Sequence, residues 1–83
     1  MSKTFHLTIA RVGENVFDGE AISVSLPGSE GSFEVLAGHE PFVSELSSGE
    51  ARIETPDGKK LSIALSKGGV AEVSGMQATV LLS

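Results

Sequence analysis

Hydrophobic and polar residues alternate along most of this chain. Phe5, Leu7 and Ile9 are separated by polar residues, and the same alternation returns over residues 22–26. Similar short runs occupy residues 33–35, 51–55, 61–65, 70–73 and 78–82. Successive side chains of a β-strand point to opposite faces of its sheet, so this pattern is typical of strands with one buried face. The sequence therefore predicts an all-β protein.

The predicted strands are separated by residues that favour chain reversal, because Gly permits positive φ, Pro fixes φ and Asp bonds its own backbone. The tripeptide Pro56-Asp57-Gly58 predicts a hairpin between residues 51–55 and 60–65. Further turns are predicted at Gly68-Gly69, Asp18-Gly19 and Ser74-Gly75. Short strands with turns about every eight to twelve residues indicate a sandwich or a small barrel, and we favour the sandwich.

The chain of 83 residues is expected to form one domain over residues 1–83, because it leaves no room for two hydrophobic cores. No stretch has helical periodicity with caps at both ends, although residues 38–46 alternate irregularly enough to hold one turn of helix. The longest apolar run, Val80-Leu81-Leu82, is far shorter than the roughly 20 residues that cross a bilayer. The first residues lack the basic start and apolar stretch of a secretory signal. The absence of cysteine excludes disulfides.

The charged residues are scattered along the chain. Eleven acidic residues against six Lys and Arg give a formal net charge of −5. The only adjacent basic pair is Lys59-Lys60, beside the predicted hairpin turn. A surface that follows nucleic-acid phosphates needs clustered Lys and Arg, so we expect no nucleic-acid partner.

Catalytic and metal-binding signatures are incomplete in this sequence. His39-Glu40 begins like a zinc-protease motif, but Val43 stands where the second histidine is needed. With no cysteine and only two histidines, we expect no metal site. Neither a phosphate-binding loop nor a nucleophile elbow is present, so we expect no bound nucleotide, no cofactor and no catalytic residue. The carboxylates that leave a catalytic alternative open are Glu30, Glu34, Glu40 and Glu45, for which solvated surface charge is the favoured interpretation.

One segment carries a more specific signal. From Leu26 to Pro41 the sequence combines a Pro-Gly-x-x-Gly turn, an apolar strand through Phe33 and Val35, and a Gly-His-x-Pro sequence. This segment resembles the signature stretch of the ATP synthase epsilon family. The similarity covers nearly the whole chain, because Phe17-Asp18-Gly19 and Gly68-Gly69-Val70 also agree in register.

The resemblance implies both a fold and a function. It implies a ten-stranded β-sandwich of two five-stranded sheets. It also implies a non-catalytic rotor subunit that links the gamma subunit to the c-ring and couples proton flow to ATP synthesis. Such a subunit lies peripherally at the cytoplasmic face of the bacterial inner membrane or its organellar equivalent, without inserting into the membrane. We expect no homo-oligomer.

The resemblance further implies two partner surfaces. Contacts with the c-ring are expected at Ser29, Glu30, Gly31 and Ser32, with Glu30 as the main polar contact. Contacts with the gamma subunit are expected at Arg11, His39, Glu40 and Phe42. Structural roles in turns are expected of Gly28, Gly38, Pro41, Gly68 and Gly69.

A purely structural role competes with several of these assignments. Gly28, Gly31 and Gly38 fit positions that need positive φ or close backbone approach. His39 is a candidate to bond backbone groups before Pro41, and Phe42 is a candidate core residue. Many members of the family carry an acidic residue at the position of Ser32, so one charge of the expected c-ring surface is missing here.

Two expectations concern the extent of the chain and the alternative function. Most bacterial members continue into a helical hairpin that inhibits ATP hydrolysis and in some members binds nucleotide. Because this chain stops at Ser83, we expect no such hairpin, no ATP binding and no inhibition. The alternative function is a free-standing β-sandwich module that binds a protein or peptide through an exposed sheet edge.

Overall fold

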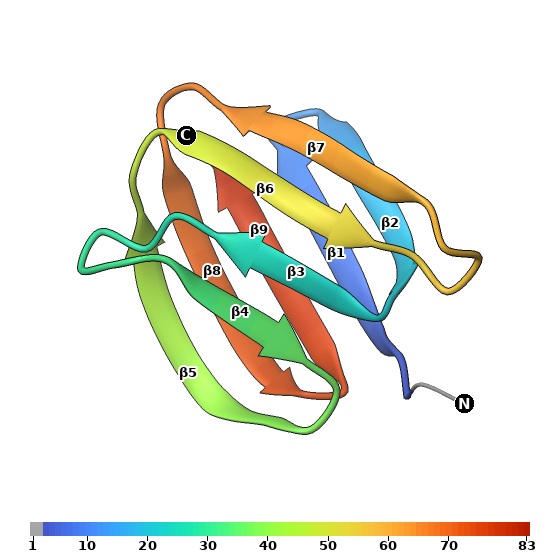
Figure 1. Cartoon of the computed structure of the whole chain (residues 1–83). Coiled ribbons are helices and arrows are strands. Elements are labelled where there is room, and N and C mark those ends of the chain that lie inside the picture. Colours follow the sequence, from blue (N-terminus) through green and yellow to red (C-terminus); the bar gives the residue numbers. More distant parts are fainter. Residues whose placement is uncertain (1–2) are drawn as a thin grey trace.

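The structure, a computed structural model, describes residues 3–83 and consists of two β-sheets packed face to face (Figure 1). This part of the chain contains no helix. The strands are β1 (Phe5–Arg11), β2 (Glu14–Ala21), β3 (Ser23–Leu26), β4 (Phe33–Leu36), β5 (His39–Leu46), β6 (Gly49–Glu54), β7 (Lys60–Leu65), β8 (Gly69–Gly75) and β9 (Gln77–Leu82). The predicted all-β sandwich is therefore confirmed.

The two sheets differ in size. One has five strands in the order β2-β1-β9-β8-β5, and the other has four in the order β4-β3-β6-β7. Neighbouring strands are antiparallel except β1 and β9, which are parallel. The described residues thus form nine strands rather than the expected ten. β5 runs along one edge of the five-stranded sheet and also makes an isolated bridge from Leu46 to Gly28, in the segment that follows β3.

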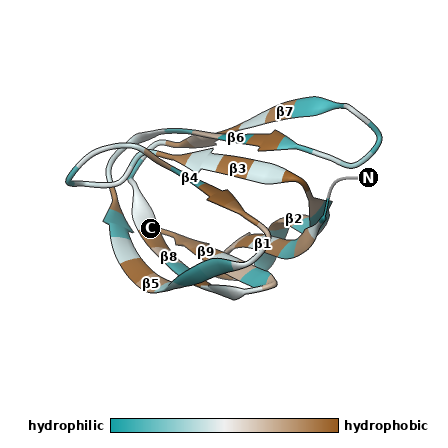
Figure 2. Ribbon diagram, turned by 60° about the horizontal axis from the view of Figure 1, so that its bottom comes forward, coloured by the Kyte–Doolittle hydropathy of each residue, from teal (hydrophilic) through white to brown (hydrophobic). Residues whose placement is uncertain are grey.

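The core lies between the sheets and follows the alternation in the sequence. Phe5, Leu7 and Ile9 of β1 are at most 1% exposed, while the residues between them are half-buried. Figure 2 shows hydrophobic bands interrupted by hydrophilic ones along the strands of both sheets. Burial of one such large apolar side chain contributes roughly 1.5–3 kcal/mol, which makes this alternation the main source of stability. The other buried residues are Ala21, Val24, Leu26, Val35, Leu46, Ala51, Ile53, Leu65, Ala71, Val73, Ala78 and Val80.

One local prediction was wrong, and one possibility that the sequence left open is not realised. Asp18-Gly19 is not a turn but lies inside β2, where Asp18 pairs with Thr8 and Gly19 with Leu7. Residues 38–46 hold no helical turn, because β5 begins at His39 and pairs with β8. A register shift between His39 and Phe42 interrupts the period of two there, which explains the irregular pattern that suggested a helix.

The remaining turn predictions are confirmed. The Pro56-Asp57-Gly58 segment joins β6 to β7: Gly58 has φ +87°, and the Thr55 N–H donates to the Lys59 carbonyl at 2.9 Å. Gly75 closes the connection to β9 with φ +58°.

The glycine pair between β7 and β8 has little space around it. Gly68 has φ +71°, and a Cβ there would overlap the carbonyl oxygen of Leu46. At Gly69 the lack of space alone requires glycine, because a Cβ there would overlap the carbonyl oxygen of Leu81.

The sandwich is closed on one side and open on the other. Next to β4 and β5, the Ser29 N–H donates to the Glu45 carbonyl at 2.9 Å, and the Ser47 N–H donates to the Pro27 carbonyl at 2.8 Å. These bonds tie the end of β5 to the segment that follows β3. On the opposite side, where β7 and β2 are the edge strands, no backbone hydrogen bond within residues 3–83 joins these two strands to each other.

A polar cluster covers the outer face of β1 and β2. His6 lies between two carboxylates, with Nε2 2.5 Å from Asp18 Oδ1 and Nδ1 3.2 Å from Glu20 Oε2. The Thr4 hydroxyl donates to the other Glu20 oxygen at 2.8 Å. Hydrogen bonds to Asp18 and then Glu20 raise the pKa of His6. Hydrogen bonds from Thr4 and then His6 lower the pKa of Glu20.

Replacement of Gly68 by alanine is expected to destabilise the protein by roughly 3 kcal/mol in urea unfolding. The cost of positive φ is about 1–2 kcal/mol, and displacement of the Leu46 backbone adds a similar amount. Gly13→Ala is the matched control, because Gly13 has φ +79° with nothing within 4 Å of the added Cβ. This variant is expected to lose only about 1 kcal/mol of unfolding free energy. Equal losses of unfolding free energy in the two variants would contradict the close-approach explanation.

The polar cluster predicts a stability difference that depends on pH. A raised pKa of His6 stabilises the fold below the ordinary histidine value of 6.5, and this contribution is lost as pH rises through the folded value. A lowered pKa of Glu20 stabilises it above the ordinary value of 4.5, and this is lost as pH falls. The advantage of the native chain over His6→Gln, measured by urea unfolding, should therefore peak between these values. A pH-independent difference would refute the assignment.

Candidate interaction surfaces

The loop between β3 and β4 carries the residues expected to contact the c-ring. Ser29, Glu30, Gly31 and Ser32 are all exposed, and the loop projects from one end of the sandwich (Figure 1). Glu30 makes no ion pair with any described residue, so its carboxylate is available to a partner.

Two glycines hold this loop in a compact form. A Cβ on Gly28 would lie 2.5 Å from the Gly31 carbonyl oxygen and 2.9 Å from the ring of Phe33. The Gly31 N–H donates to the Gly28 carbonyl at 3.0 Å, and Gly31 itself has φ +131°. A local backbone requirement therefore accounts for both glycines, as the structural interpretation of the sequence allowed.

An open hollow beside the loop brings residues of both expected surfaces together. Ser29, Glu30 and Gly31 line one wall of this depression of about 650 Å³, and Phe42 to Glu45 of β5 line the other. Phe33 lies between them, with its ring centroid 4.9 Å from that of Phe42 in an edge-to-face arrangement. Phe42 is thus half-buried against the core and also reaches the wall next to the loop.

The expected gamma-contact residues do not form one cluster. His39 pairs with Gly75 at one end of the five-stranded sheet. Arg11 ends β1 at the other end of this sheet, because its neighbour Ala10 pairs with Leu81 near the end of β9. Sequence reasoning could not detect this separation, because it depends on the order of the strands in the sheet.

The His39 side chain is occupied locally. Its Nδ1 lies 2.7 Å from the backbone oxygen of Glu40, and its ring is stacked on Phe42 with centroids 5.3 Å apart. This arrangement fits the structural role weighed for His39, while Glu40 and Pro41 next to it are exposed. Gly38 before it has φ +84°, which explains a glycine at the turn into β5.

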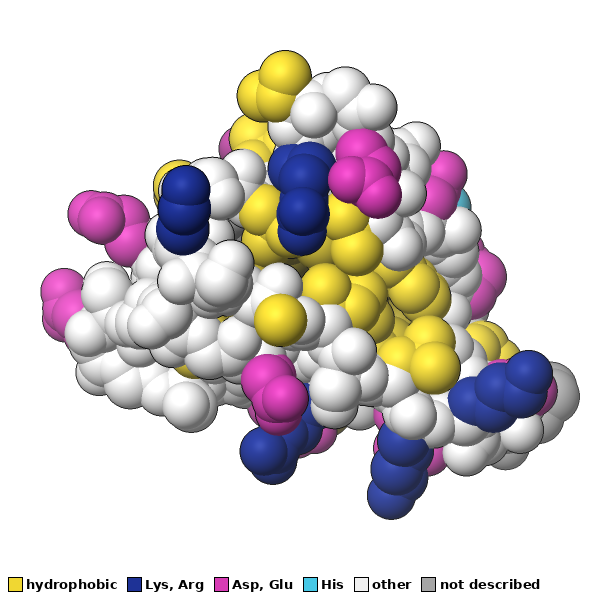
Figure 3. Space-filling model, turned by 90° about the horizontal axis from the view of Figure 1, so that it is seen from above, with side chains coloured by type: hydrophobic (Ala, Val, Ile, Leu, Met, Phe, Trp, Pro, Cys, Tyr) yellow, Lys and Arg dark blue, Asp and Glu magenta, His cyan; other side chains and the backbone are white. Residues whose placement is uncertain are grey.

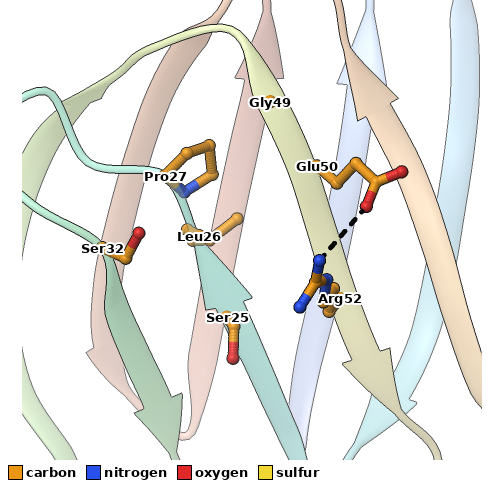
Figure 4. Close-up of a pocket in the computed structure, with 7 residues that line it drawn as sticks. All are labelled: Ser25, Leu26, Pro27, Ser32, Gly49, Glu50 and Arg52. Carbon is orange, nitrogen blue, oxygen red and sulfur yellow. Dashed lines mark ion pairs between the residues drawn. The ribbon is translucent and has the colours of Figure 1, made fainter.

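A second hollow lies on the four-stranded sheet near the same end of the molecule (Figure 4). It has a volume of about 420 Å³ and is lined by Ser25, Leu26, Pro27, Ser32, Gly49, Glu50 and Arg52. Arg52 Nη2 lies 3.6 Å from Glu50 Oε1, and both side chains are more than half exposed. An exposed ion pair of this kind contributes only about 0–1 kcal/mol and leaves both charged groups accessible.

Of the carboxylates that left a catalytic alternative open, Glu30 and Glu45 line the hollow between the loop and β5. Glu34 lies on β4, and Glu40 lies near the start of β5. Within residues 3–83, no three His, Asp or Glu side chains are placed to hold a metal ion. No helix long and apolar enough to cross a membrane occurs in this part of the chain.

Comparison with known proteins agrees with the fold. The family model described as "ATP synthase, Delta/Epsilon chain, beta-sandwich domain" matches residues 4–83. The ATP synthase epsilon chain of Bradyrhizobium sp. (strain ORS 278) is 41% identical over 78 residues, which are 94% of this chain and 56% of that protein. The epsilon chain of a Nitratiruptor species is 44% identical over 95% of this chain and 60% of its own length. The chain thus spans little more than half of these relatives.

Solved structures show the same architecture. A chain of the Euglena gracilis mitochondrial ATP synthase, in a structure of its OSCP, F1 and c-ring, superposes with a TM-score of 0.88 at 28% identity over 95% of this chain and 50% of that one. A chain of the Tetrahymena thermophila mitochondrial ATP synthase central stalk and c-ring has a TM-score of 0.70 at 10% identity, which shows the fold alone. The epsilon-family resemblance of the sequence is therefore confirmed, and the chain belongs to the delta/epsilon family of ATP synthases as its β-sandwich domain.

Proposed function

We propose that this chain is a non-catalytic central-stalk subunit of a proton-translocating F-type ATP synthase. It links the gamma subunit to the c-ring, so that rotation driven by proton flow is coupled to ATP synthesis. The observation that carries the proposal is the family match over residues 4–83. The superposition on a chain of an ATP synthase that contains F1 and c-ring supports it.

The architecture suits the transmission of torque. Two sheets share one apolar core in which no polar side chain among residues 3–83 is buried. A close-packed interior of this kind resists compression and passes strain from one surface to another. The closure between the β3–β4 loop and the end of β5 fixes the loop to the body, so that a force applied to the loop reaches both sheets.

The c-ring surface of this proposal is the β3–β4 loop. Glu30 stands exposed and unpaired among the described residues, beside the hollow that the loop forms with β5. A carboxylate in this state gains partners on binding without losing an internal ion pair. Ser29, Gly31 and Ser32 supply the neighbouring backbone and hydroxyl groups.

The gamma surface of this proposal includes the start of β5, where Glu40 is exposed and His39 and Phe42 are half-buried. Arg11, at the other end of the sheet, forms a separate part of this surface. The subunit lies peripherally at the cytoplasmic face of the bacterial inner membrane or its organellar equivalent, as part of the assembled enzyme. It requires no cofactor and binds no nucleic acid.

The alternative function, recognition of a peptide through a sheet edge, is favoured by one observation. β7 is an edge strand of the four-stranded sheet and pairs only with β6. An exposed edge accepts an additional strand from another chain. Binding to an isolated peptide in the absence of any affinity for gamma would favour this alternative.

The chain is expected to form a one-to-one complex with the purified gamma subunit of the same enzyme in size-exclusion chromatography. Replacement of Glu40 by lysine and of Phe42 by alanine should weaken this complex about tenfold, since a charge contact and an aromatic contact are lost. Glu34→Lys, an exposed position on β4 outside both expected partner surfaces, is the control for the change of charge. Failure of the folded native chain to co-elute with gamma at micromolar concentration would reject the rotor assignment.

Replacement of Glu30 by lysine is expected to lower the affinity for detergent-solubilised c-ring, measured together with gamma, by about tenfold. The change removes an exposed carboxylate and introduces a like charge where a basic partner group is expected. Glu72→Lys makes the same change on β8, away from the loop, and should bind as the native chain does. Equal affinity of native chain and Glu30→Lys would show that this carboxylate faces no c-ring group.

A further inference from the structure

The sheets have four edges, and the β7 edge is the least protected of them. β2 carries three acidic residues and a register shift against β1. β4 is only four residues long. β5 contains Pro41, a register shift and the hydrogen bonds that close the sandwich. Charges, proline, irregular pairing and short length are the usual means of preventing an edge from accepting another strand.

β7 has almost none of these features. Its six residues from Lys60 to Leu65 contain no proline and pair with β6 without a register shift. Its only charged residue is Lys60, at the first position. A regular, uninterrupted edge of this length is a template for one more strand.

The hairpin geometry determines which backbone groups of β7 are free. The Thr55 N–H donates to Lys59, whereas the carbonyl of Glu54 accepts from Ile22 on the other side of β6. Hydrogen-bonded pairs alternate in an antiparallel ladder, so Leu61, Ile63 and Leu65 bond to β6. The N–H and C=O groups that point outward therefore belong to Lys60, Ser62 and Ala64.

An apolar groove runs below this edge, on the open side of the sandwich. The inward side chains of β7 become steadily more exposed along the strand, from Leu65 at 1% through half-buried Ile63 to Leu61 at 38%. On β2, Phe17 is half-buried and Gly19 has no side chain to fill the space next to it. Figure 3, which looks onto this side from above, shows a hollowed area of hydrophobic side chains with both basic and acidic side chains around it.

Basic residues flank the edge at both ends, although the chain as a whole has a net charge of −5. Lys60 begins β7 and Lys67 follows it, and neither makes an ion pair with a described residue. Arg11 lines a small hollow of about 170 Å³ together with Ala64 and Lys67.

The positive charges at both ends of the edge favour an acidic partner over a second copy of this chain. If the β7 strands of two copies paired antiparallel, Lys60 at the start of one strand would lie near Lys67 after the end of the other. Like charges opposite each other destabilise such a pair. An extended segment with apolar residues at alternate positions and acidic residues near its ends fits both the groove and the flanks. A second copy of this chain does not.

We propose that an extended, acidic segment of the gamma subunit adds to the β7 edge as a fifth strand of the four-stranded sheet. The inference rests on the proposed function, which supplies the partner, and it goes further by assigning the contact and its backbone geometry. Alternate side chains of the added strand enter the groove between β7 and β2. Arg11 then belongs to this contact, which explains why it lies far from His39.

The test is binding of purified gamma subunit to variants at the middle of the edge. Ser62→Pro removes an outward N–H and no bond to β6, so the fold is retained while strand addition is blocked. Its affinity for gamma should fall at least tenfold. Ser62→Thr keeps the N–H and favours a strand, so it should bind within twofold of the native chain.

If Ser62→Pro is poorly folded, a charge variant tests the same contact. Lys67→Glu should weaken binding to gamma about fivefold, whereas Lys3→Glu, the same change away from the edge, should not weaken it. Amide exchange measured by NMR gives a direct readout, because within β7 it is the N–H groups of Lys60, Ser62 and Ala64 that should gain protection when gamma binds.

The outcomes separate the two proposals. If the native chain binds gamma, but the folded Ser62→Pro variant binds equally well or the three amides stay unprotected, strand addition is wrong and the rotor assignment stands. If the native chain does not bind gamma, both are wrong. Self-association of the native chain that Ser62→Pro abolishes would show that a second copy occupies the edge, and would also overturn the proposal.

Discussion

The closure of the sandwich around Leu46 is the constraint on which the rest of the structure depends. Leu46 pairs with Gly69 in the five-stranded sheet and makes a bridge to Gly28 beyond the end of the other sheet. Its carbonyl oxygen also occupies the space that a side chain on Gly68 would need. One short stretch of β5 therefore fixes the relative position of the two sheets, the loop after β3 and the turn before β8.

This closure has consequences for the surface. It gives the exposed Glu30 a rigid base, since the adjacent Ser29 is bonded to β5. On the opposite side of the sandwich no backbone hydrogen bond joins β2 to β7, so the β7 edge and the groove beneath it remain available within the described residues. A body that is rigid at one side and open at the other can hold one partner by a fixed loop and another by strand addition.

Much of the fold was predictable because its signals are local. The alternation at Phe5, Leu7 and Ile9 and the Pro56-Asp57-Gly58 turn depend on neighbouring residues, and both predictions are confirmed. The features that the sequence did not reveal depend on distant pairing. Asp18-Gly19 has the composition of a turn, but pairing with β1 keeps it extended. The start of β5 loses its alternation because of a register shift that only its pairing with β8 reveals.

The sequence by itself determined the all-β class, the positions of most strands and the family, since side-chain period, turn residues and the segment from Leu26 to Pro41 are properties of consecutive residues. Only the tertiary structure decided which of the expected site residues share a surface. It places Arg11 and His39 at opposite ends of one sheet and brings Asp18 and Glu20 to His6. It also decided that β7 is an open edge, because strand order and the closure at Leu46 arise from hydrogen bonds between residues far apart in the chain.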